Sequence, residues 1–130
     1  MPERSSDWFR QAKRDIETAK ILLKDRFFEW ACFIAQQASE KAIKAVYQKL
    51  GAEGWGHSVS NLLRGLIEKI EVSEDLINRA KSLDRFYILA RYPSGWPSGI
   101  PAEYITREDT QDAINNSEKI LQFCENLLVG

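Results

Sequence analysis

Histidine and cysteine are scarce in this chain of 130 residues, which contains one histidine and two cysteines. Cys32 and Cys124 lie far apart and lack the Cys-x-x-Cys spacing of metal or redox sites. Both have apolar neighbours in segments of helical pattern, so we expect reduced thiols packed in a core. The single histidine, His57, and the scattered carboxylates offer too few ligands for a metal site. We therefore predict neither a metal nor another cofactor.

Long apolar runs are also absent. A membrane-spanning helix needs a run of about 18 apolar residues or more, and the chain has none. The first stretch, MPERSSDWFRQ, is charged and has no apolar segment, which argues against a signal peptide. These absences predict a cytoplasmic protein that does not span a membrane.

The chain has no large excess of charge of either sign. Its formal net charge is −1, which argues against a protein whose whole surface binds nucleic acid. The net charge still allows a local basic site. The densest candidate is the segment 79–91, where one acid, Asp84, is set against the bases Arg79, Lys81, Arg85 and Arg91.

Apolar residues recur at steps of three and four along most of the chain, and no alternating strand pattern competes with them. The predicted helices cover residues 7–24, 28–50 and 59–70, a stretch from the Ser73 cap to residue 90, and a stretch that starts at TRED (106–109). TRED is similar to a capping box with Asp in the place of Glu. The other expected caps are Ser5 or Ser6, and His57 or Ser58. Four long helices and one short one predict an all-α antiparallel bundle, a single domain over residues 1–130.

One face of the second predicted helix consists of alanines. A seam of such small side chains lets a neighbouring helix approach closely. We interpret this seam as core, and a dimer interface is the alternative that stays open. The alanines are Ala31, Ala35, Ala38, Ala42 and Ala45.

The segment RYPSGWPSGIP, residues 91–101, contains three of the four prolines and ends the fourth helix. Arg91 at its start either satisfies the last carbonyls of that helix or binds a phosphate in a two-pronged manner. Tyr92 and Trp96 either stack on a base, meet a partner protein, or fold over the bundle end as a plug. We hypothesise that the segment covers a cleft or interface whose polar floor includes Arg85 and Arg91.

Three further residues are candidate phosphate ligands. His57 either caps the third helix or contacts a phosphate near that helix start. Lys41 and Lys44 share a helix face, which is interpreted either as a solvated stripe or as a nucleotide contact.

The second helix and the turn after it resemble a known family. The stretch WACFIAQQASEKAIKAVYQKLG, followed by GWGHSVSNLL, resembles the prokaryotic members of the HEPN family (higher eukaryotes and prokaryotes nucleotide-binding). ARYPSG after the fourth helix is also similar to those proteins. The resemblance covers roughly residues 6–127.

This resemblance implies a bundle of four to five helices and a homodimer. It also implies, as a partner, a minimal nucleotidyltransferase protein, in some members within a toxin–antitoxin pair. Many members are metal-independent ribonucleases with an Arg, four to six residues, His motif, whereas others bind nucleotides or partners. That motif is missing here: the positions where its histidine would stand after Arg91 hold Trp96, Pro97 and Ser98.

Because histidine is the natural proton donor and acceptor near neutral pH, its absence from the motif speaks against RNA cleavage. We therefore predict a nucleotide- or partner-binding module and not an enzyme. One alternative is an atypical ribonuclease that uses His57 with Arg85 or Arg91, and RNA would then be its ligand. A second alternative is a structural subunit without a ligand.

Overall fold

The computed structural model describes residues 3–129, and the regular secondary structure in that range is entirely helical. The predicted all-α fold is confirmed; residues 1, 2 and 130 of the predicted domain lie outside the described residues. The long helices are α1 (Ser5–Lys24), α2 (Phe28–Lys49), α4 (Glu74–Asp84) and α6 (Arg107–Leu128). The short elements are α3 (Val59–Arg64), α5 (Phe86–Leu89) and the 3-10 turns η1 (Pro93–Gly95) and η2 (Pro101–Glu103).

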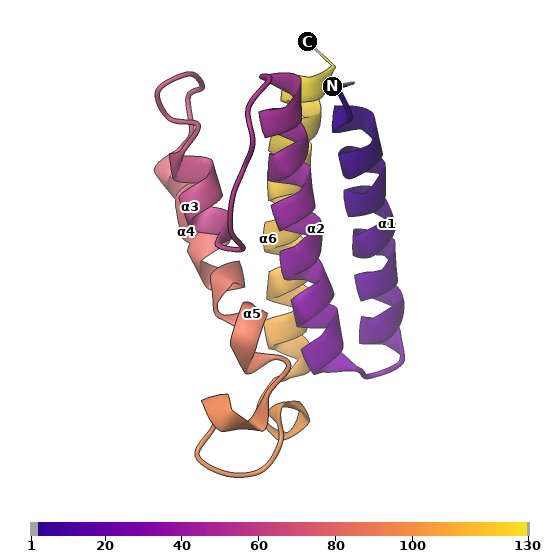
Figure 1. The fold of residues 1–130 in the computed structure, drawn as a ribbon. Coiled ribbons are helices and arrows are strands. Elements are labelled where there is room, and N and C mark those ends of the chain that lie inside the picture. Colours follow the sequence, from indigo (N-terminus) through magenta and orange to yellow (C-terminus); the bar gives the residue numbers. More distant parts are fainter. Residues whose placement is uncertain (1–2, 130) are drawn as a thin grey trace.

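The long helices run alternately in opposite directions along one axis (Figure 1). Helix α1 descends from the N-terminus, α2 rises, α4 descends and α6 rises to the C-terminus, so both termini lie at the same end. Helix α2 is central and packs against both α1 and α6. The predicted antiparallel bundle is confirmed, with α2 and α6 as its parallel pair.

The alanine seam of α2 is core within a single chain, because all five alanines are fully buried there. Small polar side chains complete the contact between α2 and α6. The hydroxyls of Ser39 and Ser117 lie 2.7 Å apart, and each also reaches the carbonyl of Ala35. Since both hydroxyls have partners, the two helices can approach closely without leaving a buried polar group unsatisfied.

The expected cap is confirmed at α6 and wrong at α1. At α6 the Thr106 hydroxyl accepts from the Asp109 N–H, and the Asp109 carboxylate accepts from the Thr106 N–H, both at 3.0 Å. Neither Ser5 nor Ser6 caps α1, because the helix already includes both. The carboxylate of Glu3 instead accepts from the Ser5 N–H. This acidic side chain fills the role at the positive helix end that the sequence pattern assigned to a serine.

Helix α3 ends at Arg64, earlier than the predicted end at Ile70. The hydroxyl of Tyr47, on α2, donates a 2.7 Å hydrogen bond to the Leu62 carbonyl, which the next turn of a longer helix would need as its acceptor. Gly65 permits the approach, because a Cβ there would lie 2.1 Å from that hydroxyl. The backbone then closes tighter turns with hydrogen bonds between residues three apart.

The predicted fourth helix is present but interrupted at Arg85, so that it forms α4 and α5. Its start is confirmed, since the Ser73 hydroxyl accepts from the Leu76 N–H at 3.1 Å. Across the interruption the Leu89 N–H lies 3.4 Å from the Arg85 carbonyl, a long hydrogen bond. In the described part of the chain, no helix is both long and apolar enough to cross a membrane.

Both cysteines are free and fully buried, as predicted. Burial raises the pKa of Cys32 to about 12 and also raises the pKa of Cys124. Because the thiolate is the reactive form, we expect neither to react with Ellman's reagent in the native protein at pH 8, and both to react in guanidinium chloride. Rapid labelling of either thiol before unfolding would contradict this burial.

Candidate functional site

Arg91 follows α5 and lies among three aromatic rings. Its guanidinium carbon is 4.4 Å from the ring centre of Phe33, 4.5 Å from Tyr87 and 4.9 Å from Tyr92. Its Nε donates a 2.7 Å hydrogen bond to the Tyr87 carbonyl, which satisfies one helix-end acceptor. Within residues 3–129 no carboxylate pairs with Arg91, and its terminal nitrogens have no hydrogen-bond partner. The guanidinium is therefore held in a fixed orientation, and its terminal nitrogens can donate hydrogen bonds to a ligand.

His57 reaches the same place from the loop that joins α2 to α3. Its ring stacks on Tyr87, with ring centres 4.7 Å apart and 14° between planes. Its Nδ1 lies 3.1 Å from Oε1 of Glu40, on α2. The side chain is 56% exposed, and Nε2 has no partner among the described residues. Tyr87 thus brings together His57 and Arg91, which are distant in the sequence.

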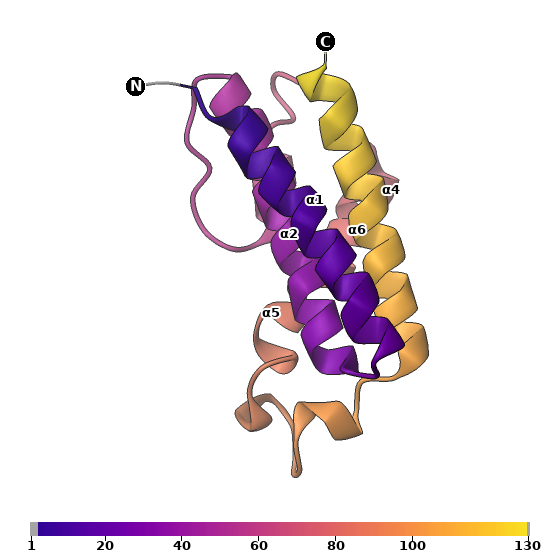
Figure 2. The same cartoon turned by 90° about the vertical axis from the view of Figure 1, so that its right-hand side faces the viewer.

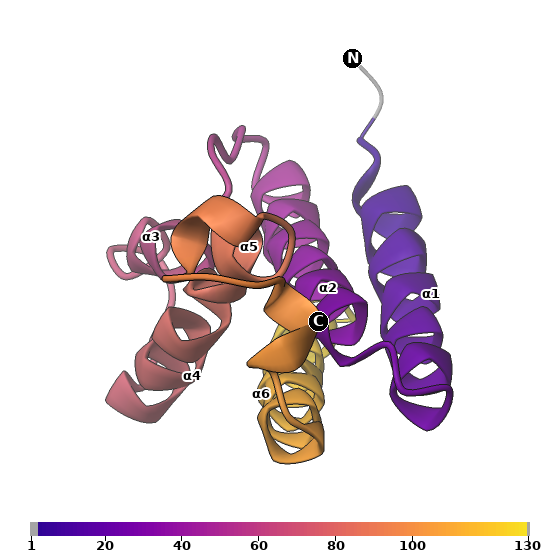
Figure 3. The same ribbon diagram turned by 90° about the horizontal axis from the view of Figure 1, so that it is seen from below.

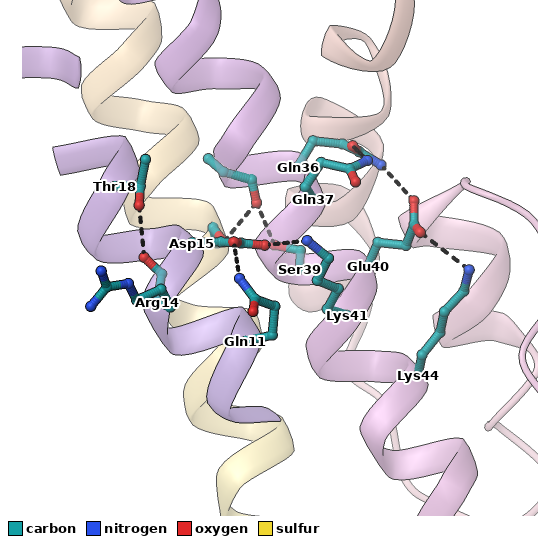
Figure 4. A network of polar contacts seen from close by, with 12 residues as sticks. Gln11, Arg14, Asp15, Thr18, Gln36, Gln37, Ser39, Glu40, Lys41 and Lys44 are labelled. Carbon is teal, nitrogen blue, oxygen red and sulfur yellow. Dashed lines mark hydrogen bonds and ion pairs between the residues drawn. The ribbon is translucent and has the colours of Figure 1, made fainter. Parts of the chain in front are cut away.

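Glu40 is a buried carboxylate at the centre of this arrangement. One oxygen faces His57, and the other accepts from the Lys44 ammonium at 3.1 Å. The Gln36 amide lies 3.4 Å from the first oxygen (Figure 4). A buried charge needs such partners. The Glu40 carboxylate therefore pairs with Lys44 and at the same time orients the His57 ring.

The loop that carries His57 is fixed from both sides. The fully buried Gln36 amide donates a 2.9 Å hydrogen bond to the His57 carbonyl. After the loop, the Asp84 carboxylate of α4 accepts four hydrogen bonds, from Ser58 Oγ, the Val59 N–H, and the N–H and hydroxyl of Ser60. The Ser58 hydroxyl also caps α3, as one of the two predicted alternatives. His57 itself is not the cap.

Lys41, another predicted phosphate ligand, clamps two helices together. Its ammonium lies 2.6 Å from the carboxylate of the buried Asp15 on α1, which also accepts from Gln11 at 2.9 Å (Figure 4). Lys41 and Lys44 are thus both engaged by internal carboxylates. Neither belongs to a freely solvated stripe, and neither offers an unpaired cation to a ligand.

Arg85 lies on a different side of the bundle from Arg91. Its guanidinium rests over Phe86 at 5.2 Å and helps to line a pocket of about 300 Å³ between α4 and α6. The acids Asp109 and Asp112 line the same pocket. This separation corrects the hypothesis that Arg85 and Arg91 share one floor beneath the proline-rich segment. The two side chains lie apart because the helix is interrupted at Arg85 and because each arginine packs against different residues.

The proline-rich segment folds across the lower end of the bundle (Figures 2 and 3). Trp96 donates from Nε1 to the Leu89 carbonyl at 2.7 Å and stacks on Tyr104, with ring centres 4.4 Å apart. Its packing against the core matches the interpretation as a plug. Of this segment, only its first two residues, Arg91 and the exposed Tyr92, belong to the site that also contains the rings of Phe33 and Tyr87.

Sequence reasoning missed Glu40, Gln36, Tyr87 and Phe33 as members of the site. Glu40 and Gln36 lie within the QQASEK stretch of α2, where polar residues at core-facing positions were the available signal. Tyr87 recurs at helical spacing with apolar residues of the fourth predicted helix, a pattern that indicates core packing and not a binding site. For metal binding, the described residues contain no group of three or more His, Cys, Asp or Glu side chains in a suitable arrangement.

Comparisons with known proteins agree over nearly the whole chain. The model of a family described as the HEPN domain matches residues 5–127. A candidate toxin protein of Methanocaldococcus jannaschii is 28% identical, over 93% of this chain and 86% of that relative.

Solved structures are similar at higher identity. A Thermus thermophilus protein is 40% identical with a TM-score of 0.94, over 97% of this chain and 99% of that one. An archaeal HEPN homologue is 37% identical with a TM-score of 0.82, over 96% and 98%. A HEPN domain protein from Thermotoga maritima is 41% identical with a TM-score of 0.79, over 95% and 98%.

Proposed function

The chain belongs to the HEPN domain family, and from that premise we propose that it is a binding module which holds the phosphate of a nucleotide at Arg91. The observation that carries this proposal is the state of the Arg91 guanidinium. Three rings and one carbonyl fix it, and no carboxylate neutralises it within residues 3–129. A guanidinium held in this way is preorganised for two parallel hydrogen bonds to phosphate oxygens.

His57 is the second ligand in this proposal. Glu40 occupies Nδ1, so Nε2 is the atom that meets a phosphate oxygen next to Arg91. Tyr87 sets the spacing between the two, because its ring contacts both. The roles of Lys41 and Lys44 are then to hold α1 to α2 and to balance the Glu40 charge.

The module is further proposed to act with a nucleotidyltransferase protein in a toxin–antitoxin-like pair, as a homodimer in the cytoplasm. The similarity to a candidate toxin of Methanocaldococcus jannaschii supports this context. Exposed apolar side chains around the Arg91 site support a docking role: Ile88 and Tyr92 are each 47% exposed, and Trp30, which packs edge-on against Phe33, is 45% exposed. Tryptophan, tyrosine and arginine are the residues that most often dominate protein interfaces.

A second candidate function is RNA cleavage, which one observation favours. The contact between His57 and the Glu40 carboxylate is the arrangement that orients a histidine as a general base. Arg91 would then stabilise the charge on the reacting phosphate. Arg85 has no part in this version, because it faces the α4–α6 pocket.

One experiment separates these functions. The purified protein is titrated with ATP, GTP and a short RNA by calorimetry, and the RNA is then checked on a gel. We expect saturable binding, intact RNA, and a roughly 5- to 10-fold loss of affinity in His57→Ala, as one hydrogen bond would give. RNA cleavage that disappears in His57→Ala would instead establish the ribonuclease. The absence of any binding would reject both ligand-based functions and favour a structural subunit.

A further inference from the structure

Among the exposed large hydrophobic side chains of residues 3–129, Trp55 has the highest exposed fraction, 81%. It lies in the loop of residues 51–58, two positions before His57. A tryptophan buries a large area wherever it finds a partner, so an indole left in water on a fixed backbone indicates a contact with something else.

Backbone contacts hold that loop against α2 and α3. The Ala52 N–H donates a 2.9 Å hydrogen bond to the Tyr47 carbonyl. Gly54 lies so close to Tyr47 and Leu62 that a Cβ there would be 3.0 and 3.1 Å from their side chains. At the far end, the Gln36 amide holds the His57 carbonyl. The loop therefore presents Trp55 from a preorganised position, which lowers the entropy lost on binding.

A pocket of about 400 Å³ opens beside Trp55, a volume within the range of small-molecule sites. Trp8, from the first turn of α1, supplies a second indole. Lys44, Gln48 and Glu53 supply polar groups, and His57 forms one edge. His57 thus belongs both to this pocket and, through Tyr87, to the Arg91 site.

The charges in the pocket restrict what it can hold. The Lys44 ammonium is already paired with Glu40, and the Glu53 carboxylate adds a negative charge. A bare anion is therefore disfavoured. Indole faces suit a planar ring, while the Gln48 amide and the Glu53 carboxylate can donate to and accept from the edge of a heterocycle.

We propose that this pocket binds the nucleobase of the ligand whose phosphate Arg91 and His57 hold. The inference rests on the proposed function and extends it by assigning the base to Trp55 and Trp8. A free nucleotide and a single-stranded RNA carry the same chemistry, a base on a phosphorylated ribose. The test therefore uses both as probes.

Trp55→Leu, Trp55→Phe and the wild type are titrated with AMP and with a short single-stranded oligoadenylate. We expect Trp55→Leu to weaken binding roughly 10-fold, which corresponds to about 1.4 kcal/mol of lost stacking. Trp55→Phe should recover part of the affinity, because it keeps an aromatic face. Phe27→Leu is the matched control, since it changes another exposed aromatic side chain that lines neither the pocket nor the Arg91 site.

The outcomes separate this inference from the proposed function. If Trp55→Leu binds both probes as the wild type does while Arg91→Ala does not, the base pocket is wrong and the phosphate site stands. If Trp55→Leu loses affinity and Arg91→Ala keeps it, the pocket stands and the phosphate assignment falls. A Trp55-dependent loss with the oligoadenylate alone identifies RNA as the source of the base. If the wild type binds neither probe, both proposals are rejected.

Discussion

Asp84→Ala is expected to lower the free energy of unfolding by about 3 kcal/mol. The Asp84 carboxylate accepts from two backbone N–H groups at 2.6 and 3.3 Å and from two hydroxyls at 3.0 and 2.6 Å, all at the start of α3. Alanine removes every acceptor at once, and it leaves Val59 and Ser60, which are buried, with unsatisfied donors. Leaving such donors unpaired costs more than the net value of the bonds themselves.

The measurement is urea denaturation followed by circular dichroism, with two further variants. Asp84→Asn keeps one acceptor oxygen and should lose less stability than Asp84→Ala. Asp75→Ala removes an exposed acid of the same helix, paired with Arg79 at 2.9 Å, and should cost less than about 1 kcal/mol. Equal denaturation midpoints for Asp84→Ala and Asp75→Ala would show that the carboxylate does not fix α3.

The bundle could be predicted from the sequence because its determinants are local or periodic. The spacing of apolar residues in α1, α2 and α6 places each buried stripe without knowledge of its partner. The Thr106–Asp109 box and the Ser73 cap act within four residues of chain. The end of α3 was mispredicted because a hydroxyl from another helix, that of Tyr47, captures its Leu62 carbonyl. No local pattern announces such a contact.

The site was predictable only as a set of residue types. Arg91 and His57 were singled out for their chemistry, and the structure brings both to Tyr87. The partner of Lys41 could not be read from the chain, because Asp15 lies on another helix. Lys44, in contrast, pairs with Glu40 four residues earlier on the same helix, a contact that helical spacing allows. Helical spacing says which side chains share a face, but tertiary packing decides which charges remain unpaired.

Arg85 and Arg91 show the same limit within one predicted helix. Their proximity in the sequence suggested a joint basic floor. Packing directs Arg85 toward α6 and Arg91 toward the aromatic rings next to α2. A single charge-rich segment therefore serves two surfaces, and only the Arg91 surface lies beside a histidine.

The largest functional effect is expected from Arg91→Ala, which should weaken nucleotide binding roughly 100-fold or more. The variant removes two charge-assisted hydrogen bonds to phosphate, each worth about 1.5–3 kcal/mol. It also removes a cation that Phe33, Tyr87 and Tyr92 hold in place before the ligand arrives. Calorimetric titration with AMP gives the affinity directly, and a thermal melt of each variant verifies that the bundle is intact.

Two further variants separate geometry from charge. Arg91→Lys keeps the positive charge but loses the planar fork, so its affinity should fall between those of the wild type and Arg91→Ala. Arg107→Ala is the matched control, because Arg107 also rests on a ring, that of Phe28 at 5.3 Å, but outside the site. If Arg107→Ala weakened AMP binding as much as Arg91→Ala, the effect would reflect net charge. A loss confined to Arg91, and only partly recovered by lysine, requires a two-pronged phosphate contact at that side chain.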